Sequence, residues 1–292
     1  MHVVSNEFLE IQVRDQGAEI RSIKSKKDGH EYLWNGDPKW WQFSAPTLFP
    51  IVGRLKDLRY RFHGKDYELP CHGFSRTSEF KKASDGDGFI SFTLESSEKT
   101  IACYPWQFKL SIGYRLEGRR ILVLWAVENR DQNEMLFSIG AHPGFRCPLD
   151  EGLKFEDCYI EFDATEDTPI LLTTKEGGLY QKKECGKLKG RRLDLNYGMF
   201  KDDVLLFDRL RSSSMTLRSD KTSRYVKVIA PDFPYWGIWT PTKGGAPFVC
   251  IEPWIGRPDD SDTDGDLRHK GGIIRLSPTQ KYTNGYVIEI GE

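Results

Sequence analysis

Two adjacent segments, residues 110–116 and 121–127, restrict the fold of this chain more than any others. In the first segment every second residue is Leu, Ile or Tyr, which is typical of a strand with one buried face. After a turn at Gly118, the second segment reads ILVLWAV and is apolar without alternation. A continuously apolar strand beside an alternating one indicates burial on both faces, so we expect the middle of stacked β-sheets here.

Strand signals of this kind recur along the chain, and residues 3–34 show no helical periodicity. Further strands are predicted at residues 8–13, 18–23, 31–34, 89–94, 154–162, 170–173, 204–207, 214–218, 225–229, 247–251, 273–276 and 286–290. Residues 58–69 alternate around His63-Gly64 and predict a hairpin. The pattern as a whole predicts an all-β protein.

Two segments depart from the strand pattern. Ser97 predicts the N-cap of a short helix over residues 98–103, which Pro105 would end. Residues 179–196 are basic and polar, and we interpret them as a solvated excursion from the fold. Because no linker and no change of composition divides the chain, a single domain over residues 1–292 is expected.

Composition limits the function classes. The chain has 292 residues, 38% of them hydrophobic, and a formal net charge of -1, which argues against nucleic-acid binding. No signal peptide and no run long enough to span a membrane are present, so we expect a soluble, cytoplasmic protein. The six cysteines (Cys71, Cys103, Cys147, Cys158, Cys185 and Cys250) show no CxxC spacing, and reduced buried thiols are expected.

The segment GGAPFVCIEPW, residues 244–254, contains the first candidate catalytic group. Its apolar run predicts a buried strand that ends at Pro253 and leaves Glu252 at the strand end. A carboxyl group placed there, with its stem in a low dielectric, acquires a raised pKa and becomes a proton acceptor near neutrality. The alternative is a strand-end glutamate paired with an arginine.

Three further segments place polar residues beside prolines and glycines. SIGAHPGFRCP contains His142, LPCHGFSR contains His72 followed by Arg76, and APTLFPIVGRLKD contains Arg54. No P-loop, GxGxxG, HExxH or GxSxG motif occurs, so nucleotide transfer, hydride transfer, zinc peptidase and serine hydrolase chemistry lose their usual support. A histidine and a glutamate facing one bound molecule form an acid and base pair that needs neither a metal nor a covalent intermediate.

Two other features have competing interpretations. Trp34, Trp40, Trp41 and Phe43 form either an aromatic wall of a sugar site or part of the core, and core is favoured for each residue. Residues 259–266 resemble the first half of a calcium loop. However, Gly271 stands where the loop requires Glu, so a solvated acidic loop is favoured.

Four motifs together resemble those of a known family: GRLKD, CHGFSR, GAHPGF and IEPWIGRPDD. Their order and spacing, with GAEIRSIK, EYLW and APTLFPIVGRL, resemble the aldose 1-epimerase (galactose mutarotase) family, and more closely its LacX-like branch. The resemblance extends nearly from end to end. Each motif alone is weak, but the combination is specific. One departure is HGFSR where HGFAR is expected, a change that should not alter the chemistry.

The resemblance implies a mostly antiparallel β-supersandwich of the galactose mutarotase type, with few short helices. It also implies interconversion of the α and β anomers of an aldose without a cofactor or a metal. By this resemblance, Glu252 is the general base that takes the proton from the anomeric hydroxyl, and His142 is the general acid that protonates the ring oxygen. The ring then opens, rotates about its C1–C2 bond and closes as the other anomer.

The resemblance also implies a set of sugar-binding residues. His72 and Arg54 would bind and orient the sugar, and the binding aspartate corresponds to Asp203 or its neighbour Asp202, with Asp203 preferred. The HGF-R and AHPGF forms also occur in hexose-6-phosphate mutarotase-like relatives. Arg54 and Arg76 could therefore hold a phosphate, for which arginine forks are suited. The small-molecule partner is thus a free or a phosphorylated hexose.

Two other functions compete with this interpretation. A glycoside hydrolase or polysaccharide lyase on a related sandwich is less favoured, because hydrolysis usually requires two carboxylates and only Glu252 is convincingly placed. A sugar-binding or sensing protein without catalysis is the third hypothesis, since a fold does not guarantee an activity.

Overall fold

The computed structural model describes residues 1–174 and 179–292, with residues 181–183 and 185 described by their backbone alone. The strands are β1 (His2–Ser5), β2 (Leu9–Val13), β3 (Ile20–Ser25), β4 (Thr47–Leu48), β5 (Arg59–Phe62), β6 (Lys65–Glu68), β7 (Lys81–Gly86), β8 (Phe89–Glu95), β9 (Phe108–Glu117), β10 (Arg120–Asn129), β11 (Met135–Phe137), β12 (Ile139–Ala141), β13 (Gly144–Arg146), β14 (Cys158–Thr173), β15 (Tyr180–Asp194), β16 (Leu205–Asp208), β17 (Ser214–Ser219), β18 (Tyr225–Ile229), β19 (Tyr235–Trp239), β20 (Phe248–Ile255), β21 (Ile274–Leu276) and β22 (Lys281–Gly291). The helical elements are α1 (Glu98–Cys103) and the 3-10 turns η1 (Lys56–Leu58), η2 (Ser75–Thr77), η3 (Phe155–Asp157), η4 (Tyr197–Phe200) and η5 (Leu267–His269).

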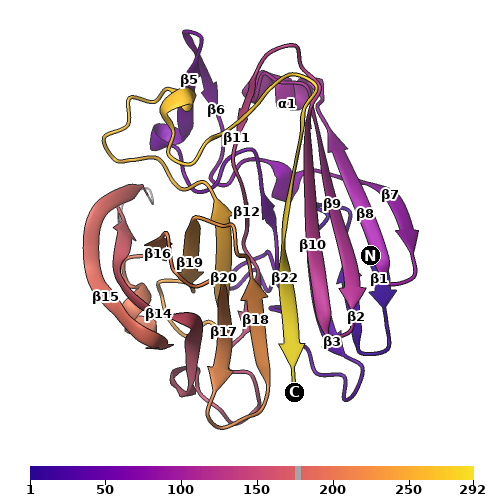
Figure 1. Cartoon of the computed structure of the whole chain (residues 1–292), viewed down its shortest axis with the longest axis vertical. Helices are drawn as coiled ribbons and strands as arrows, with labels where there is room; N and C mark the ends of the chain where they lie inside the picture. The colour runs from indigo at the N-terminus through magenta and orange to yellow at the C-terminus, as the bar shows by residue number, and fades with distance from the viewer. Residues whose placement is uncertain (175–178) are drawn as a thin grey trace.

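Most strands belong to one large sheet. Its main order is β4-β12-β20-β19-β16-β14-β17-β18-β22-β10-β9-β8-β7, with β13 added beside β20 and β15 beside β14. Figure 1 shows β7 to β10 on one side of the C-terminal strand β22 and β14 to β20 on the other. Smaller sheets comprise β1-β2-β3, β5-β6 and β11-β21. The predicted all-β, mostly antiparallel fold is confirmed.

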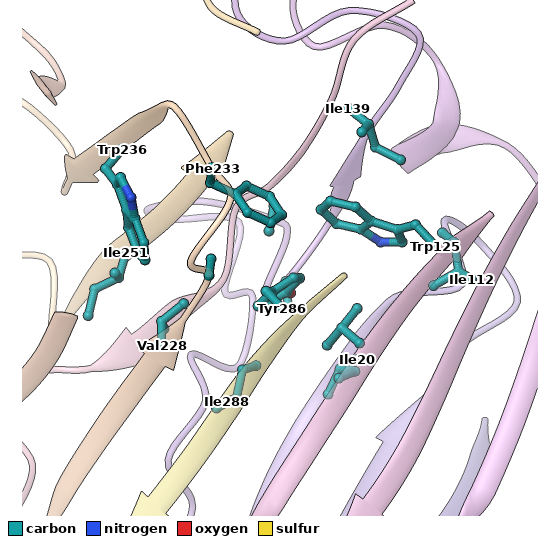
Figure 2. Packing of buried hydrophobic residues seen from close by; sticks show 14 of the residues in the cluster. Ile20, Ile112, Trp125, Ile139, Val228, Phe233, Trp236, Ile251, Tyr286 and Ile288 are labelled. Carbon is teal, nitrogen blue, oxygen red and sulfur yellow. The ribbon is translucent and has the colours of Figure 1, made fainter. Parts of the chain in front are cut away.

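The core lies along the inner face of this sheet, where strands distant in the sequence contribute side by side. Figure 2 shows Trp125 of β10 and Tyr286 of β22 converging with Phe233, and the rings of Trp125 and Tyr286 lie 5.5 Å apart. The expected burial of residues 121–127 on both faces is wrong. The side chain of Leu124 is 41% exposed, because β10 presents only its other face to the core.

The predictions that rest on capping and turn residues agree with the structure. The helix α1 covers the predicted residues, and the Ser97 hydroxyl accepts a hydrogen bond from the Thr100 N–H at 3.3 Å. The predicted hairpin is β5-β6, in which Tyr60 faces Tyr67. Residues 31–34, by contrast, pair only through isolated bridges and form no strand of their own.

The interpretation of residues 179–196 as a solvated excursion is wrong. Most of this stretch is β15, which pairs with β14 at the edge of the large sheet (Figure 1). The two strands predicted at residues 154–162 and 170–173 are parts of the single long strand β14. An edge strand has one side unpaired, and polar, basic residues suit it because they discourage pairing with other chains.

Five of the cysteines, all except Cys185, are free thiols; Cys147, Cys158 and Cys250 are buried as expected, whereas Cys71 and Cys103 are only partly buried. The side chain of Cys185 lies outside the described residues. No helix in the described part of the chain is long and apolar enough to cross a membrane.

Candidate active site

A cavity of about 310 Å³ opens beside β20 and contains all six residues that the motifs single out. Its lining includes Arg54, His72, Arg76, His142, Asp203 and Glu252. These residues come from five separate segments of the chain, and only the tertiary structure brings them together.

Glu252 lies in the middle of β20 and not at a strand end. The predicted termination at Pro253 is wrong, since β20 continues to Ile255 and Pro253 faces Trp236 of β19. The opposite edge of β20 explains why a proline is accepted there. The Ile251 N–H points to that edge and donates to Pro143 O at 3.2 Å, so Pro253 directs its missing N–H toward the same, interrupted edge.

The interruption in this edge places His142. Two short strands, β12 and β13, pair with β20 through Gly140 opposite Trp254 and Gly144 opposite Cys250. His142 lies between them, so the register sets it opposite Glu252. Its Nε2 is 3.1 Å from the Glu252 Oε2.

Both members of this pair are buried, with side-chain exposures of 8% for His142 and 1% for Glu252. Neither carboxylate oxygen of Glu252 accepts a hydrogen bond from any described residue, and the His142 Nδ1 has no partner there either. Buried polar atoms are normally hydrogen-bonded, and exceptions need an explanation. A ligand whose hydroxyl groups supply the missing donors provides one.

Burial shifts both groups toward their neutral forms. The pKa of Glu252 is raised well above its ordinary value, first by burial and then by the nearby charge of Asp203. The pKa of His142 is lowered to about 3 by burial and by the positive charge of Arg76. Burial thus disfavours the charged form of each group, the carboxylate of Glu252 and the imidazolium of His142, although the two side chains lie within hydrogen-bonding distance.

His72 approaches the pair from a different loop, with its ring centre 5.4 Å from that of His142. The Gly53 N–H donates to the His72 Nδ1 at 3.1 Å. Burial, followed by the charges of Arg76 and His142, lowers the pKa of His72 well below its ordinary value. A neutral ring that accepts at Nδ1 carries its proton on Nε2, so His72 is set to donate a hydrogen bond to a ligand oxygen.

Asp203, and not Asp202, lines the cavity. Its Oδ1 accepts a hydrogen bond from the Trp239 Nε1 at 2.8 Å, and burial raises the pKa of its carboxyl group. The backbone of Asp203 has a φ of 89°, which turns the chain immediately before β16. The indole group thus orients the carboxylate that faces Glu252 across the cavity.

The two arginines provide the positive charge of the site. Arg76, in η2, donates from Nη2 to Cys71 O at 2.8 Å, and its guanidinium group lies 4.8 Å from the ring centre of Phe43. Arg54 follows the predicted irregular apolar loop, and its carbonyl oxygen accepts from the Asp259 N–H at 2.9 Å. The predicted Arg partner for Glu252 is not observed among the described residues, where Glu252 contacts His142 instead.

Sequence reasoning missed several residues of the cavity wall. Trp41 belongs to the aromatic cluster for which core was favoured, yet its ring centre lies 4.6 Å from that of His142. Trp34 does belong to the core, stacked on Phe248. Thr173, whose buried Oγ1 has no partner in the described structure, lines the cavity without any motif to signal it. The clustering of tryptophans was the one signal available.

The acidic segment 259–266 departs from the expected solvated loop only at its start, since Ser261, Asp262 and Asp264 are exposed. Asp259 is buried and paired with Lys270, while Asp260 pairs with Arg257. Within the described residues, the one group of His, Cys, Asp and Glu side chains that is close enough to hold a metal lies elsewhere and consists of His142, Cys250 and Glu252.

Comparisons with known proteins place the chain in a family. The Aldose 1-epimerase family model matches residues 1–265. The chain is similar to the chromosomal protein LacX of Lactococcus lactis subsp. lactis, with 34% identity and 98% of each chain covered. A galactose mutarotase related enzyme from Lactobacillus acidophilus superposes with a TM-score of 0.93 at 33% identity, covering 100% of this chain and 97% of its own. A galactose mutarotase-like protein from Lactobacillus casei ATCC 334 gives a TM-score of 0.93 at 27% identity, with 99% of both chains covered.

These matches extend over nearly the full length of the chain and include the strands that carry the buried Glu252 and His142 pair. The motifs and the antiparallel sheet agree with them. The chain is therefore a member of the aldose 1-epimerase family.

Proposed function

We propose that this protein is an aldose 1-epimerase that interconverts the α and β anomers of a hexose by acid–base ring opening and reclosure. The observation that carries the proposal is the buried Glu252 carboxyl group, which lacks hydrogen-bond donors in the described structure and lies 3.1 Å from His142. The cavity, at about 310 Å³, is at the small end of ligand pockets and suits one sugar ring.

In the proposed mechanism, Glu252 takes the proton of the anomeric hydroxyl and His142 gives a proton to the ring oxygen. Both oxygens are bonded to the same carbon of the sugar, so neighbouring groups can reach them together. Ring opening requires Glu252 as the carboxylate and His142 as the imidazolium. It ends with Glu252 protonated and His142 neutral, and reclosure reverses both proton transfers. Sugar hydroxyls that donate to the Glu252 oxygens would favour the carboxylate form and so prepare the base.

The remaining residues have binding roles in this proposal. The Nε2 proton of His72 and the Arg54 guanidinium group would hold sugar hydroxyls. Asp203, oriented by Trp239, would accept from another hydroxyl. Each positioned acid or base contributes about 10²–10⁴-fold to the rate.

Exchange between anomers, followed by NMR, tests the proposal. We expect the wild type to accelerate exchange, and Glu252→Gln and His142→Ala each to reduce the acceleration by at least about 10²-fold. Sugar binding, measured separately by calorimetry, should persist in Glu252→Gln. Binding by the wild type without any catalysed exchange would instead favour a sugar-binding or sensing protein.

A 6-phosphorylated hexose is a second candidate substrate, favoured by the presence of both Arg54 and Arg76 in the cavity wall. Free and 6-phosphorylated aldoses compared in the same NMR assay distinguish the two substrates. If the phosphorylated sugar is preferred, Arg76→Gln should raise its KM more than that of the free sugar, since the guanidinium group would then bind phosphate.

A further inference from the structure

A thiol lies directly beside the proposed acid and base. Cys250 precedes Glu252 by two positions on β20, so both side chains point to the same face of the sheet. One ligand atom each from Cys250, Glu252 and His142 lie within 4.8 Å of one another. No step of the proposed sugar chemistry uses the thiol.

The donor set is chemically specific. A thiolate, an imidazole and a carboxylate form the mixed set that binds zinc, whereas magnesium and calcium prefer oxygen ligands. Two of the three side chains also have unused ligand atoms, since both oxygens of Glu252 and the Nδ1 of His142 lack partners among the described residues. All three groups are buried, and two of them, His142 and Glu252, line the cavity, with Cys250 beside them on β20.

The spacing is close to what one ion requires. Zinc binds sulfur at about 2.3 Å and nitrogen or oxygen at about 2.0–2.2 Å. Donor atoms within 4.8 Å of one another can therefore reach a common ion after small side-chain rotations. Three protein ligands leave a fourth position for water, and His142 and Glu252 connect the group to the cavity.

We propose that Cys250, His142 and Glu252 form a binding site for a thiophilic divalent cation, best fitted by Zn²⁺, and that the bound ion blocks the sugar site. The ion takes the same carboxylate and imidazole that would handle the sugar protons. Zinc and sugar therefore exclude each other, and the metal is an inhibitor and not a cofactor. The inhibition rests on the proposed mutarotase activity, but the binding does not.

Titration with Co²⁺ tests the binding without any activity assay, because a thiolate ligand to cobalt produces a charge-transfer absorption band in the near ultraviolet. We expect the wild type to show this band, Zn²⁺ to abolish it and Mg²⁺ to leave it unchanged. Cys250→Ala should lose the band and bind Zn²⁺ at least tenfold more weakly by calorimetry. Cys158→Ala is the matched control, because it also removes a buried thiol but should keep the band.

Absence of the band in the wild type, or its persistence in Cys250→Ala, would overturn the site. Circular dichroism establishes that each variant is folded, and Cys250→Ser replaces the alanine variant if that one is not. A separate experiment measures the effect of Zn²⁺ on activity. Zn²⁺ should inhibit anomer exchange in competition with sugar, and Cys250→Ala should exchange at the wild-type rate while resisting Zn²⁺. A cobalt band in a protein without exchange activity would leave the metal site standing and refute the proposed function alone.

Discussion

Two buried acid–base pairs lie in or next to the same cavity and differ in their hydrogen bonding. Glu252 lies 3.1 Å from His142, and Asp259 lies 3.0 Å from Lys270. In each pair both side chains are at most 8% exposed. Distance and burial alone do not separate them.

The hydrogen-bond partners of the two pairs do distinguish them. The Asp259 carboxylate accepts from the Lys56 N–H at 3.1 Å as well as from Lys270, and the Lys270 Nζ also donates to Arg257 O at 2.6 Å. Glu252 receives no hydrogen bond from the described residues. A fully bonded buried charge stabilises architecture, whereas a buried carboxyl group without donors costs stability and indicates a ligand site.

The pair of Asp259 and Lys270 also supports the backbone of the candidate site. The Asp259 N–H donates to Arg54 O at 2.9 Å, and its carboxylate accepts from Lys56 two residues further on. Asp259 therefore fixes the backbone at the carbonyl of the cavity-lining Arg54 and at the N–H of Lys56. The satisfied pair thus supports a residue proposed to bind sugar, and the unsatisfied pair keeps hydrogen-bonding capacity that a ligand could use.

The largest expected effect is on stability, from Lys270→Met. It leaves the Asp259 charge buried without its counter-ion, which should lower the free energy of unfolding by about 3–5 kcal/mol. Urea denaturation measures the change. The double variant Lys270→Met with Asp259→Asn should recover much of the loss, because the amide oxygen can still accept from the Lys56 N–H. A loss below about 1 kcal/mol in the single variant would contradict the structural role given to the pair.

Glu252→Gln should have the opposite sign and stabilise the protein by about 1–3 kcal/mol at pH 8, since the amide avoids the cost of a buried charge. The raised pKa of Glu252 means that the folded state holds a proton that the unfolded state loses above about pH 4.5. Wild-type stability therefore falls as the pH rises from that value toward the folded pKa, and the advantage of Glu252→Gln grows over the same range.

Glu166→Gln is the matched control for this experiment. Glu166 is also buried, but its carboxylate accepts from the Ser212 N–H and the Ser212 hydroxyl, both at 2.7 Å. Replacing it should therefore destabilise the protein. If both glutamine variants shift stability in the same direction at pH 8, the distinction between the two kinds of buried carboxyl group is refuted.

A smaller effect is expected from Trp239→Phe, which removes the N–H that holds Asp203 at 2.8 Å. Loss of one such hydrogen bond corresponds to about a 2–10-fold rise in KM for the sugar, with less change in kcat. Steady-state kinetics by NMR measures both constants. Trp236→Phe, which shrinks a buried indole outside the cavity, serves as the control and should leave KM unchanged.

The smallest effect is expected at the surface. Arg59 and Glu68 form an ion pair at 2.7 Å, with side chains 64% and 70% exposed. Arg59→Ala should change the free energy of unfolding by less than about 1 kcal/mol, and added salt should shrink the difference further. A loss of stability as large as that of Lys270→Met would show that proximity, and not hydrogen bonding in a buried setting, determines how much these ion pairs contribute to the free energy of unfolding.

Much of the fold was predictable because it depends on local signals. Alternating residues, turn residues and the Ser97 cap located β8, β9, the β5-β6 hairpin and α1. The same logic failed for β15, whose polar residues suit an edge strand that only its partner β14 defines. It also failed at Pro253, because a proline inside a strand is accepted only where the neighbouring edge is interrupted.

The residue types of the candidate site could also be recognised from their motifs, but their arrangement could not. Only the backbone turn at Asp203, where φ is 89°, distinguishes this residue from Asp202, because the turn directs the Asp203 carboxylate into the cavity. Trp41 and Thr173 line the cavity because of how the chain packs, and no spacing of residues in the sequence predicts such packing. Asp259 lies in the IEPWIGRPDD motif, but nothing in the sequence pairs it with Lys270.

By itself, the sequence determined that this is an all-β protein with a carboxylate and an imidazole in glycine- and proline-flanked segments, because strand periodicity and motifs are short-range properties. Only the tertiary structure decided that Glu252 and His142 lie face to face, because the pairing of β20 with β12 and β13 brings together two residues that are far apart in the sequence. It also decided which buried carboxylate is satisfied and which is left for a ligand, because hydrogen-bond partners come from the whole fold.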